Sequence, residues 1–313
     1  MKSASFLKIA AVTATAALIL VGTTACGRGG GEAPGDKIVM AISTLNNPFF
    51  VELRDGAQAA AKEAGVELSI VDAQNDSATQ ANQLATAAAS GAKAVIVNPV
   101  DSDAAASAVD ALITAGIPVI GVDRTVTGVD LASLVASDNV AGGRQAADEL
   151  AKAMGETGTV IHLQGVAGTS ASRERGAGFD EGMKAYPDIT VVATQTANFD
   201  RAAALDVTTN LLQANPGVTG LFAENDEMAL GAIQALGDKA GSEVFVVGFD
   251  GTTDGLDAIT AGTLVATIAQ QPAELGKLAV ESAIKAIKGE TIAKTVPVEV
   301  VSVTKTNVGD FAK

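Results

Sequence analysis

The chain has 313 residues, of which 48% are hydrophobic and only 3% aromatic. This length is enough to bury one large core or two modest ones. The formal net charge of −15 gives a surface that repels nucleic acid and anionic lipid headgroups, which argues against nucleic-acid binding and against a polybasic membrane anchor.

The first 25 residues are predicted to be an export signal. Lys2 and Lys8 form a basic start, and the apolar run 9–21 is followed by the small residues 22–25, directly before Cys26. The run is too short, and too interrupted by threonine, for a transmembrane helix. Cys26 is the only cysteine, so no intramolecular disulfide is possible.

The position of Cys26 resembles that of the acylated cysteine in a bacterial lipobox, with Thr23 where leucine is usual. An ordinary signal peptide with an incidental cysteine is the alternative. We expect Cys26 to be lipidated, so that the protein is anchored to the outer face of the cell membrane. Residues 26–36, which are rich in glycine, would then form a flexible tether.

From Asp36 onward, short β-branched runs alternate with longer alanine-rich segments of helical period. The predicted strands are 38–43, 67–71, 94–97, 118–122, 159–163, 190–194, 220–223, 244–247 and 264–269. The predicted helices are 48–64, 79–90, 103–115, 139–154, 173–185, 201–214, 227–236, 253–261 and 273–288. Gly65, Gly91 and Gly116 follow the first three helices, where glycine commonly ends a helix.

This alternation predicts parallel sheets that are covered by helices on both faces and linked by right-handed crossovers. The strands are too many for one comfortable sheet, and the pattern restarts near Ser137-Asp138-Asn139. The predicted fold class is therefore α/β, with two doubly wound, Rossmann-like lobes. The pattern alone leaves open whether the C-terminal segments return to the first lobe.

Polar and aromatic side chains gather just beyond the predicted strands, at the ends where open parallel sheets bind ligands. They lie at 46–50, 72–75, 98–99, 123–124, 164, 198–201, 224–226, 250 and 270. Amides and carboxylates pair with hydroxyl groups, arginine supplies a rigid fork of donors, and the C–H faces of a sugar lie against phenyl rings. Any one such residue is ordinarily a turn residue, a helix cap or a hydrophobic staple. Their convergence predicts a site for a polyhydroxylated ligand.

Long motifs in a fixed order resemble the bacterial D-ribose-binding proteins, which belong to the type I periplasmic sugar-binding family. The resemblance extends from Lys37 to about Val303. Its motifs are 43–50, 123–124, 136–139, 164–165, 168–170, 173–176, 225–231, 247–251 and 267–270.

The resemblance implies a type I periplasmic binding protein fold, in which two lobes are joined by a three-segment hinge, here near Ser137, Gln271 and Val300. The implied N-terminal lobe is 37–137 plus 271–299, and the C-terminal lobe is 138–270 plus 300–313. In the family the sugar lies in the cleft between the lobes, stacked between phenylalanines. Phe50 and Phe199 would hold it here.

Ten positions have the residue types of the family's sugar site. The first lobe would contribute Asn47, Phe49, Phe50, Asp123 and Arg124; the second would contribute Arg175, Phe199, Asn225 and Asp250, with Gln270 at a hinge. The implied function is delivery of D-ribose, or of a similar monosaccharide such as allose or another pentose, to the permease and ATPase of an ABC importer. We expect a monomer that needs neither cofactor nor metal.

An enzyme and a transcriptional regulator are the two alternatives to a binding protein. For an enzyme, the sole histidine, His162, falls inside a predicted strand, where we expect a structural role. Glu224 and Asp226 could mimic the paired carboxylates of a glycosidase, but neither their separation nor their pKa can be read from the sequence. The chain has no Walker loop, dinucleotide fingerprint or calcium loop. A sugar-responsive transcription factor of the lactose-repressor type shares the fold, but it needs a basic helix-turn-helix where this chain has its export signal. We therefore expect neither an enzyme nor a regulator.

Overall fold

The structure is a computed structural model that describes residues 36–311. The predicted export signal, Cys26 and all of the predicted tether except Asp36 lie outside the described residues.

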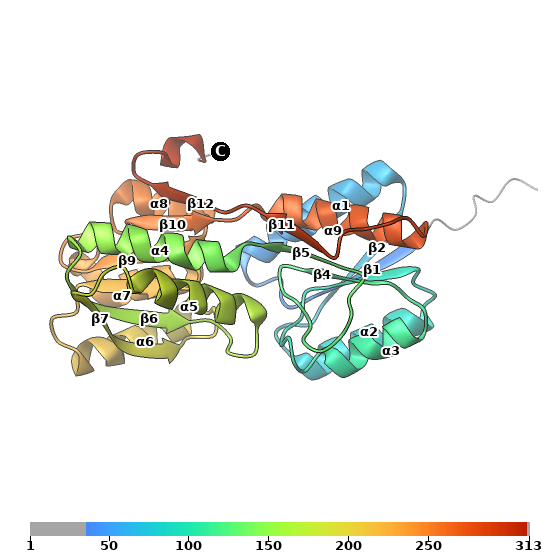
Figure 1. Cartoon of the computed structure of the whole chain (residues 1–313), viewed down its shortest axis with the longest axis horizontal. Helices are drawn as coiled ribbons and strands as arrows, with labels where there is room; N and C mark the ends of the chain where they lie inside the picture. The colour runs from blue at the N-terminus through green and yellow to red at the C-terminus, as the bar shows by residue number, and fades with distance from the viewer. Residues whose placement is uncertain (1–35, 312–313) are drawn as a thin grey trace, which may run out of the picture. The chain divides into compact units, whose positions relative to one another are not determined.

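The strands form two six-stranded sheets (Figure 1). The first sheet contains β1 (Lys37–Ile42), β2 (Glu67–Asp72), β3 (Ala94–Val97), β4 (Val119–Val122), β5 (Ser133–Ser137) and β11 (Thr295–Val298), in the order β11-β5-β4-β3-β1-β2. The second contains β6 (Gly158–Gln164), β7 (Ile189–Thr196), β8 (Gly220–Ala223), β9 (Phe245–Asp250), β10 (Ala266–Ala269) and β12 (Val301–Thr304), in the order β12-β10-β9-β8-β6-β7. All neighbouring strands are parallel except β12, which is antiparallel to β10.

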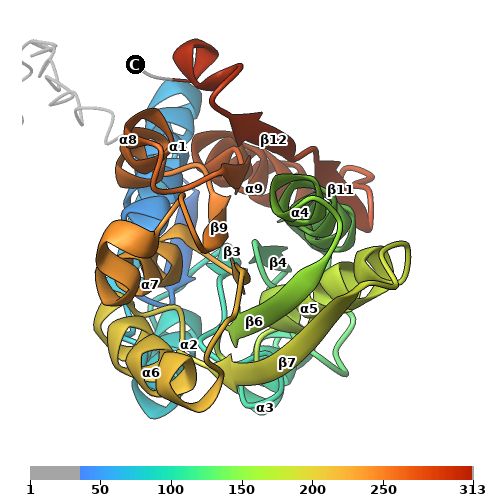
Figure 2. The ribbon, with the colours of Figure 1, turned by 90° about the vertical axis from the view of Figure 1, so that its left-hand side faces the viewer.

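Helices cover both faces of each sheet. In the first, α1 (Pro48–Ala64) and α9 (Pro272–Ile287) pack on one face, and α2 (Ser77–Ala89) and α3 (Ala106–Thr114) pack on the other. In the second, α4 (Asn139–Met154) and α5 (Ser170–Met183) lie opposite α6 (Arg201–Ala214), α7 (Asp226–Leu236) and α8 (Thr253–Ala261), as Figure 2 shows. Two short 3₁₀ turns, η1 (Gly237–Lys239) and η2 (Val308–Asp310), complete the elements. We call the first sheet with its helices the N-lobe and the second the C-lobe.

The sequence of β1 explains why its sheet is covered on both sides. Ile38, Met40 and Ile42 pack in the cluster that contains α1 and α9, whereas Val39 and Ala41 pack in the cluster that contains α2 and α3. Successive side chains of a strand point to opposite faces, so a strand that is buried on both faces must be apolar throughout. All five of these side chains are at most 5% exposed.

The chain passes between the sheets three times: between β5 and α4, between β10 and α9, and between β11 and β12. These crossings are tied to one another, because Asp138 N–H donates to the carbonyl of Val298 (3.2 Å) and Gln271 Nε2 donates to the carbonyl of Glu299 (3.1 Å). The predicted fold class, two doubly wound lobes joined by three segments, is confirmed. The residue boundaries given above for the lobes stay a prediction. They describe which residues move together when the lobes open and close.

The sequence pattern does not predict β5, β11 or β12. All three are only four or five residues long, and β11 contains Pro297, which breaks a strand pattern and is tolerated because β11 is an edge strand. The predicted starts of α2, α3 and α5 also differ from the structure by two or three residues. α2 and α5 start earlier because Asp76 and Thr169 cap them with side-chain oxygens.

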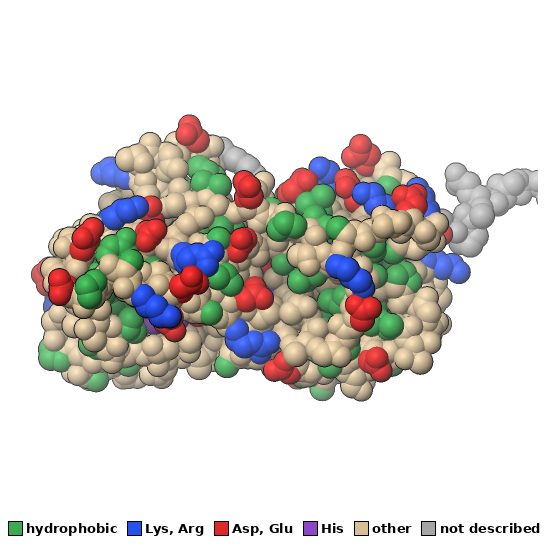
Figure 3. All heavy atoms as spheres, viewed as in Figure 1, with side chains coloured by type: hydrophobic (Ala, Val, Ile, Leu, Met, Phe, Trp, Pro, Cys, Tyr) green, Lys and Arg blue, Asp and Glu red, His purple; other side chains and the backbone are tan. Residues whose placement is uncertain are grey.

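Within residues 36–311, no helix has the length and apolar character needed to cross a membrane. On the face drawn in Figure 3, acidic and basic side chains are intermingled, and no basic patch stands out. That face therefore offers no obvious surface for a polyanion.

Candidate functional site

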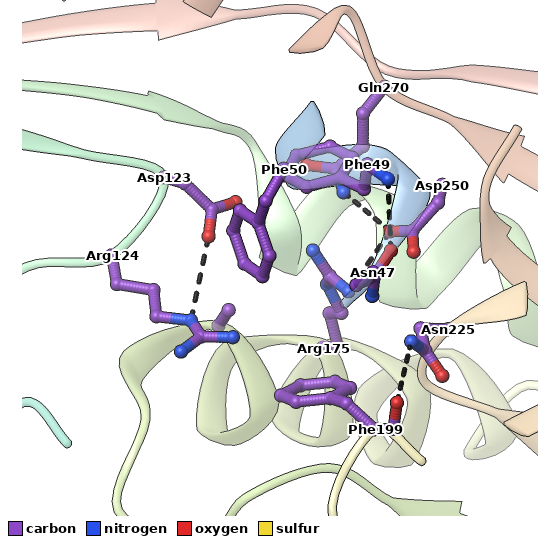
Figure 4. Close-up of a pocket in the computed structure, with 11 residues that line it drawn as sticks. Asn47, Phe49, Phe50, Asp123, Arg124, Arg175, Phe199, Asn225, Asp250 and Gln270 are labelled. Atoms are coloured by element: carbon purple, nitrogen blue, oxygen red, sulfur yellow. Dashed lines mark hydrogen bonds and ion pairs between the residues drawn. The ribbon is translucent and has the colours of Figure 1, made fainter. Parts of the chain in front are cut away.

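All ten residues expected to contact the ligand line one pocket between the lobes, joined by Ala171 (Figure 4). The space between them, part of it open to solvent, is about 240 Å³. We call it the inter-lobe pocket.

The first turn of α1 supplies three of the lining residues. Asn47 is the N-cap of α1, and its Oδ1 accepts the backbone N–H of Phe49 (2.9 Å). Pro48 at the first helical position favours the same start. The rings of Phe49 and Phe50 meet edge to face at 5.2 Å, and both are buried. A local capping pattern thus fixes both rings at the end of β1.

Asp123 and Arg124 follow β4 and are nearly fully buried, at 3% and 5% exposed. Asn98 Nδ2 donates to Asp123 Oδ2 (3.1 Å), and the same oxygen lies 3.5 Å from Arg124 Nε. Arg124 Nη1 donates to the carbonyl of Pro99 (3.0 Å). Among the residues that the structure describes, Asp123 Oδ1 and Arg124 Nε have no hydrogen-bond partner. Such buried groups are costly unless a ligand pairs with them.

Phe50 and Phe199 reach the pocket from different lobes, and Figure 4 shows their rings on opposite sides of it. The guanidinium carbon of Arg124 lies 5.2 Å from the ring centre of Phe50 and 5.5 Å from that of Phe199. These are cation–π distances, so the two rings and the arginine form one contiguous surface across the lobes. Such a surface can hold the C–H face of a sugar and one of its hydroxyl groups.

Arg175 and Asp250 form the charged side of the C-lobe. Arg175 Nη1 lies 3.5 Å from Asp250 Oδ1, which also accepts from Gln270 Nε2 at 2.7 Å. The guanidinium of Arg175 stacks on Phe249 with its central carbon 3.9 Å from the ring centre. Gln270 also lines the pocket, and its Oε1 has no hydrogen-bond partner among residues 36–311.

Asn225 completes the C-lobe wall. It is the N-cap of α7, where its Oδ1 accepts from the backbone N–H of Met228 (2.9 Å), and its Nδ2 donates to the carbonyl of Phe199 at 3.4 Å. The one side chain therefore caps a helix and holds the loop that carries Phe199.

Burial shapes the electrostatics of the pocket. It raises the pKa of the Asp123 carboxyl, which Arg124 and Arg175 oppose, and it raises the pKa of the Asp250 carboxyl well above its usual value. The pKa of the Arg124 guanidinium is lowered by the same loss of solvent. Donors from a ligand would favour the ionised form of both carboxyls.

Three lining residues have positive φ angles: Asp123 (64°), Phe199 (59°) and Asp250 (121°). Such angles are uncommon for residues other than glycine, and strain of this kind gathers at functional sites. Here it aims side chains from loops and strand ends into one space.

Three residues in or behind the pocket were not predicted from the sequence. Asn98 holds Asp123, Asn139 Oδ1 accepts from Arg175 Nε (2.9 Å), and Ala171 lines the pocket directly. Asn98 and Asn139 stand in the segments singled out from the sequence, directly after a strand and at a lobe crossing. Their partners, however, are set only by the tertiary structure.

The carboxylates that imitate a glycosidase pair have structural roles and do not line the inter-lobe pocket. Glu224 accepts from Gly165 N–H (2.7 Å) and from Ser172, and it lies 3.0 Å from Nε2 of His162, a residue within β6 as predicted. Asp226 accepts from the N–H and hydroxyl of Thr252 and from the hydroxyl of Thr267, and burial raises its pKa to about 6. Within residues 36–311, no group of three or more His, Cys, Asp or Glu side chains is arranged to hold a metal ion.

The lobes also touch each other directly beside the pocket. Ser102 N–H donates to the carbonyl of Gly168 (2.9 Å), Ser170 N–H donates to Ser102 Oγ (3.0 Å), and Thr125 N–H donates to Ser170 Oγ (3.0 Å). The lobes are therefore closed on one another in this structure.

Comparisons with known proteins agree with this arrangement. A model of the periplasmic binding protein domain matches residues 38–291. The chain is 48% identical over 270 residues to the ribose import binding protein of Escherichia coli (strain K12), covering 86% of this chain and 91% of the relative. It is 44% identical over 259 residues to the ribose import binding protein of Bacillus subtilis (strain 168), covering 83% and 84% of the two chains.

Among solved structures, the fold resembles that of an ABC transporter periplasmic solute binding protein from Actinobacillus succinogenes 130z, crystallised with bound D-allose. The TM-score is 0.82 and the sequences are 34% identical, over 88% of this chain and 99% of the other.

Proposed function

We propose that this chain, which belongs to the periplasmic binding protein family, binds a monosaccharide in the inter-lobe pocket and delivers it to the membrane permease of an ABC importer. The observation that carries the proposal is the meeting of all ten expected residues around one small pocket. D-ribose is the ligand we expect, because the ribose import binding proteins of two distant bacteria are 44–48% identical to this chain.

The chemistry of the pocket supports a sugar. Carboxylates and amide oxygens accept from hydroxyl groups, and Arg124, Arg175 and amide N–H groups donate to them. The rings of Phe50 and Phe199 offer apolar faces for the C–H groups of the sugar ring. Polar groups at several positions select among sugars, since each one left unpaired by a wrong stereoisomer costs about 1–3 kcal/mol.

We infer a two-state cycle for the lobes, which open and close about the three crossings. Neither lobe alone can satisfy a sugar that touches both, so the ligand favours the closed form by its contacts with the second lobe. The hydrogen bonds between Ser102, Ser170 and Thr125 would add to closure. The closed surface would then dock on the permease, whose transport is driven by a separate ATPase.

The site of action follows from the N-terminal sequence. An export signal over residues 1–25 would bring the folded body outside the cytoplasm, and acylation of Cys26 would tether it to the outer face of the cell membrane. Mass spectrometry of the mature protein tests this part of the proposal: a lipidated Cys26 as the first residue supports it, and an unmodified cysteine contradicts it.

A second sugar is the main alternative to ribose. A neighbour with 34% identity was crystallised with D-allose, a hexose, so allose belongs in the same trial as ribose and the other pentoses. Binding without turnover distinguishes this role from that of an enzyme.

Isothermal titration calorimetry of the mature protein against a panel of pentoses and hexoses tests the function. We expect ribose to bind most tightly and to be recovered unchanged. The proposal fails if no monosaccharide binds, or if the sugar is converted.

A further inference from the structure

The geometry points to Asn139 as a positioning residue that sets the orientation of Arg175 and thereby the affinity for the sugar. This inference rests on the proposed function. Asn139 does not line the inter-lobe pocket, yet it is only 2% exposed and lies directly behind the arginine that does.

The protein holds the guanidinium of Arg175 from three directions. Asn139 Oδ1 accepts from Nε (2.9 Å), the carbonyl of Glu224 accepts from Nη1 (2.7 Å), and the ring of Phe249 lies flat beneath the group. A planar guanidinium that is fixed at Nε and at Nη1 cannot rotate about its last bonds. Its remaining N–H groups then have one direction in which to meet a ligand.

Asn139 is itself fixed from the other side. Its Nδ2 donates to Glu174 Oε2 (3.1 Å), so its amide cannot flip without losing both contacts. Burial raises the pKa of the Glu174 carboxyl, and the bond from Asn139 acts against that rise. The hydrogen bonds therefore run in one direction: Arg175 donates to Asn139, and Asn139 donates to Glu174.

The position of Asn139 in the fold connects these hydrogen bonds to the crossing between the lobes. It is the first residue of α4, next to Asp138 at the first crossing between the lobes, and Asp138 N–H donates to Val298 beside the third crossing. The residue that orients Arg175 is thus part of the segment about which the lobes turn. A single hydrogen bond thus links Arg175, which lines the pocket, to Asn139 at the first lobe crossing.

A double-mutant cycle tests this inference. Removing one hydrogen bond to a charged group costs about tenfold to a hundredfold in affinity, so we expect that loss of ribose affinity in Asn139→Ala by calorimetry. Lysine has no Nε–H to be held, so in an Arg175→Lys background the same Asn139→Ala change should have little further effect. A purely structural role would lower affinity equally in both backgrounds, and that result would overturn the inference.

A rescue variant and a matched control separate orientation from folding. Asn139→Asp combined with Glu174→Gln reverses the donor and acceptor in the bond between positions 139 and 174. It keeps that bond and the bond from Arg175 Nε to position 139, so it should recover most of the lost affinity. Arg144→Ala removes another contact between α4 and α5, the solvent-exposed ion pair with Glu181 at 3.0 Å, which does not line the pocket, and should leave ribose affinity unchanged. The inference is contradicted if the double variant binds ribose no more tightly than Asn139→Ala does. If wild-type protein does not bind ribose, it is the proposed function that fails.

Discussion

Replacing Asp123 by asparagine is a nearly isosteric change that separates ligand binding from stability. Asparagine tolerates the left-handed φ of 64° as well as aspartate does, so the backbone strain is unchanged. If the amide oxygen keeps the bond from Asn98, the amide nitrogen takes the place of Oδ1, the atom for which the described part of the chain offers no partner. A charged acceptor for a sugar hydroxyl then becomes a neutral donor.

The size of the effect follows from that one atom. A hydrogen bond to a charged group is worth about 1.5–3 kcal/mol, so the ribose dissociation constant should rise by about tenfold to a hundredfold. Stability should move the other way. Because burial raises the pKa of Asp123, the folded protein binds the proton of this carboxyl more tightly than the unfolded chain does. The free energy of unfolding therefore falls as pH rises from the unfolded-state pKa to the raised folded-state pKa. A neutral asparagine does not have this loss.

Calorimetry with ribose and thermal unfolding without it measure the two effects. We expect weaker binding and a melting temperature for the sugar-free protein that does not fall. Asp72→Asn is the control, since Asp72 also ends a strand and accepts from Gln74 N–H (2.8 Å), but it lies outside the pocket and should bind ribose normally. Unchanged ribose affinity in Asp123→Asn would refute the reasoning, as would a loss of affinity that is matched by a fall in melting temperature.

Other predictions test stacking, closure and ionisation. Phe199→Ala removes one face of the ring sandwich and should weaken ribose binding by about tenfold to a hundredfold in calorimetry; a change below twofold would exclude stacking on this ring. Ser170→Ala leaves Thr125 N–H without its partner across the lobes, so stopped-flow measurements should show ribose leaving about two to ten times faster, and an unchanged rate would count against this closing contact. Sugar hydroxyls that donate to Asp250 lower its raised pKa, so ribose should bind more weakly at about pH 5 than at about pH 8 and should release protons; affinity that is independent of pH would contradict this.

Periodicity was sufficient to predict the two lobes, because most strands are buried on both faces. The runs 38–42 and 94–97 are continuously apolar for that reason, and glycine marks the ends of the helices that follow them. The short edge strands β11 and β12 gain their order from pairing with β5 and β10, so their own sequences carry little signal. Pro297 even argues against the strand that contains it.

The candidate site was predictable to the level of residue type and strand end. Asn47 and Asn225 are N-caps, and the N-caps of helices that follow parallel strands lie at the ligand-binding edge of the sheet. What could not be read is the set of long-range partners: Asn98 meets Asp123 across 25 residues, and Asn139 meets Arg175 across 36. Nor does any local pattern announce the positive φ of Phe199, which depends on the loop around it.

The most direct measurement is a crystal structure of the mature protein with D-ribose. We expect closed lobes with the sugar ring between Phe50 and Phe199, and with its hydroxyl groups on Asp123, Arg175 and Asp250. An empty pocket at saturating ribose, or a sugar bound elsewhere on the molecule, would contradict this expectation.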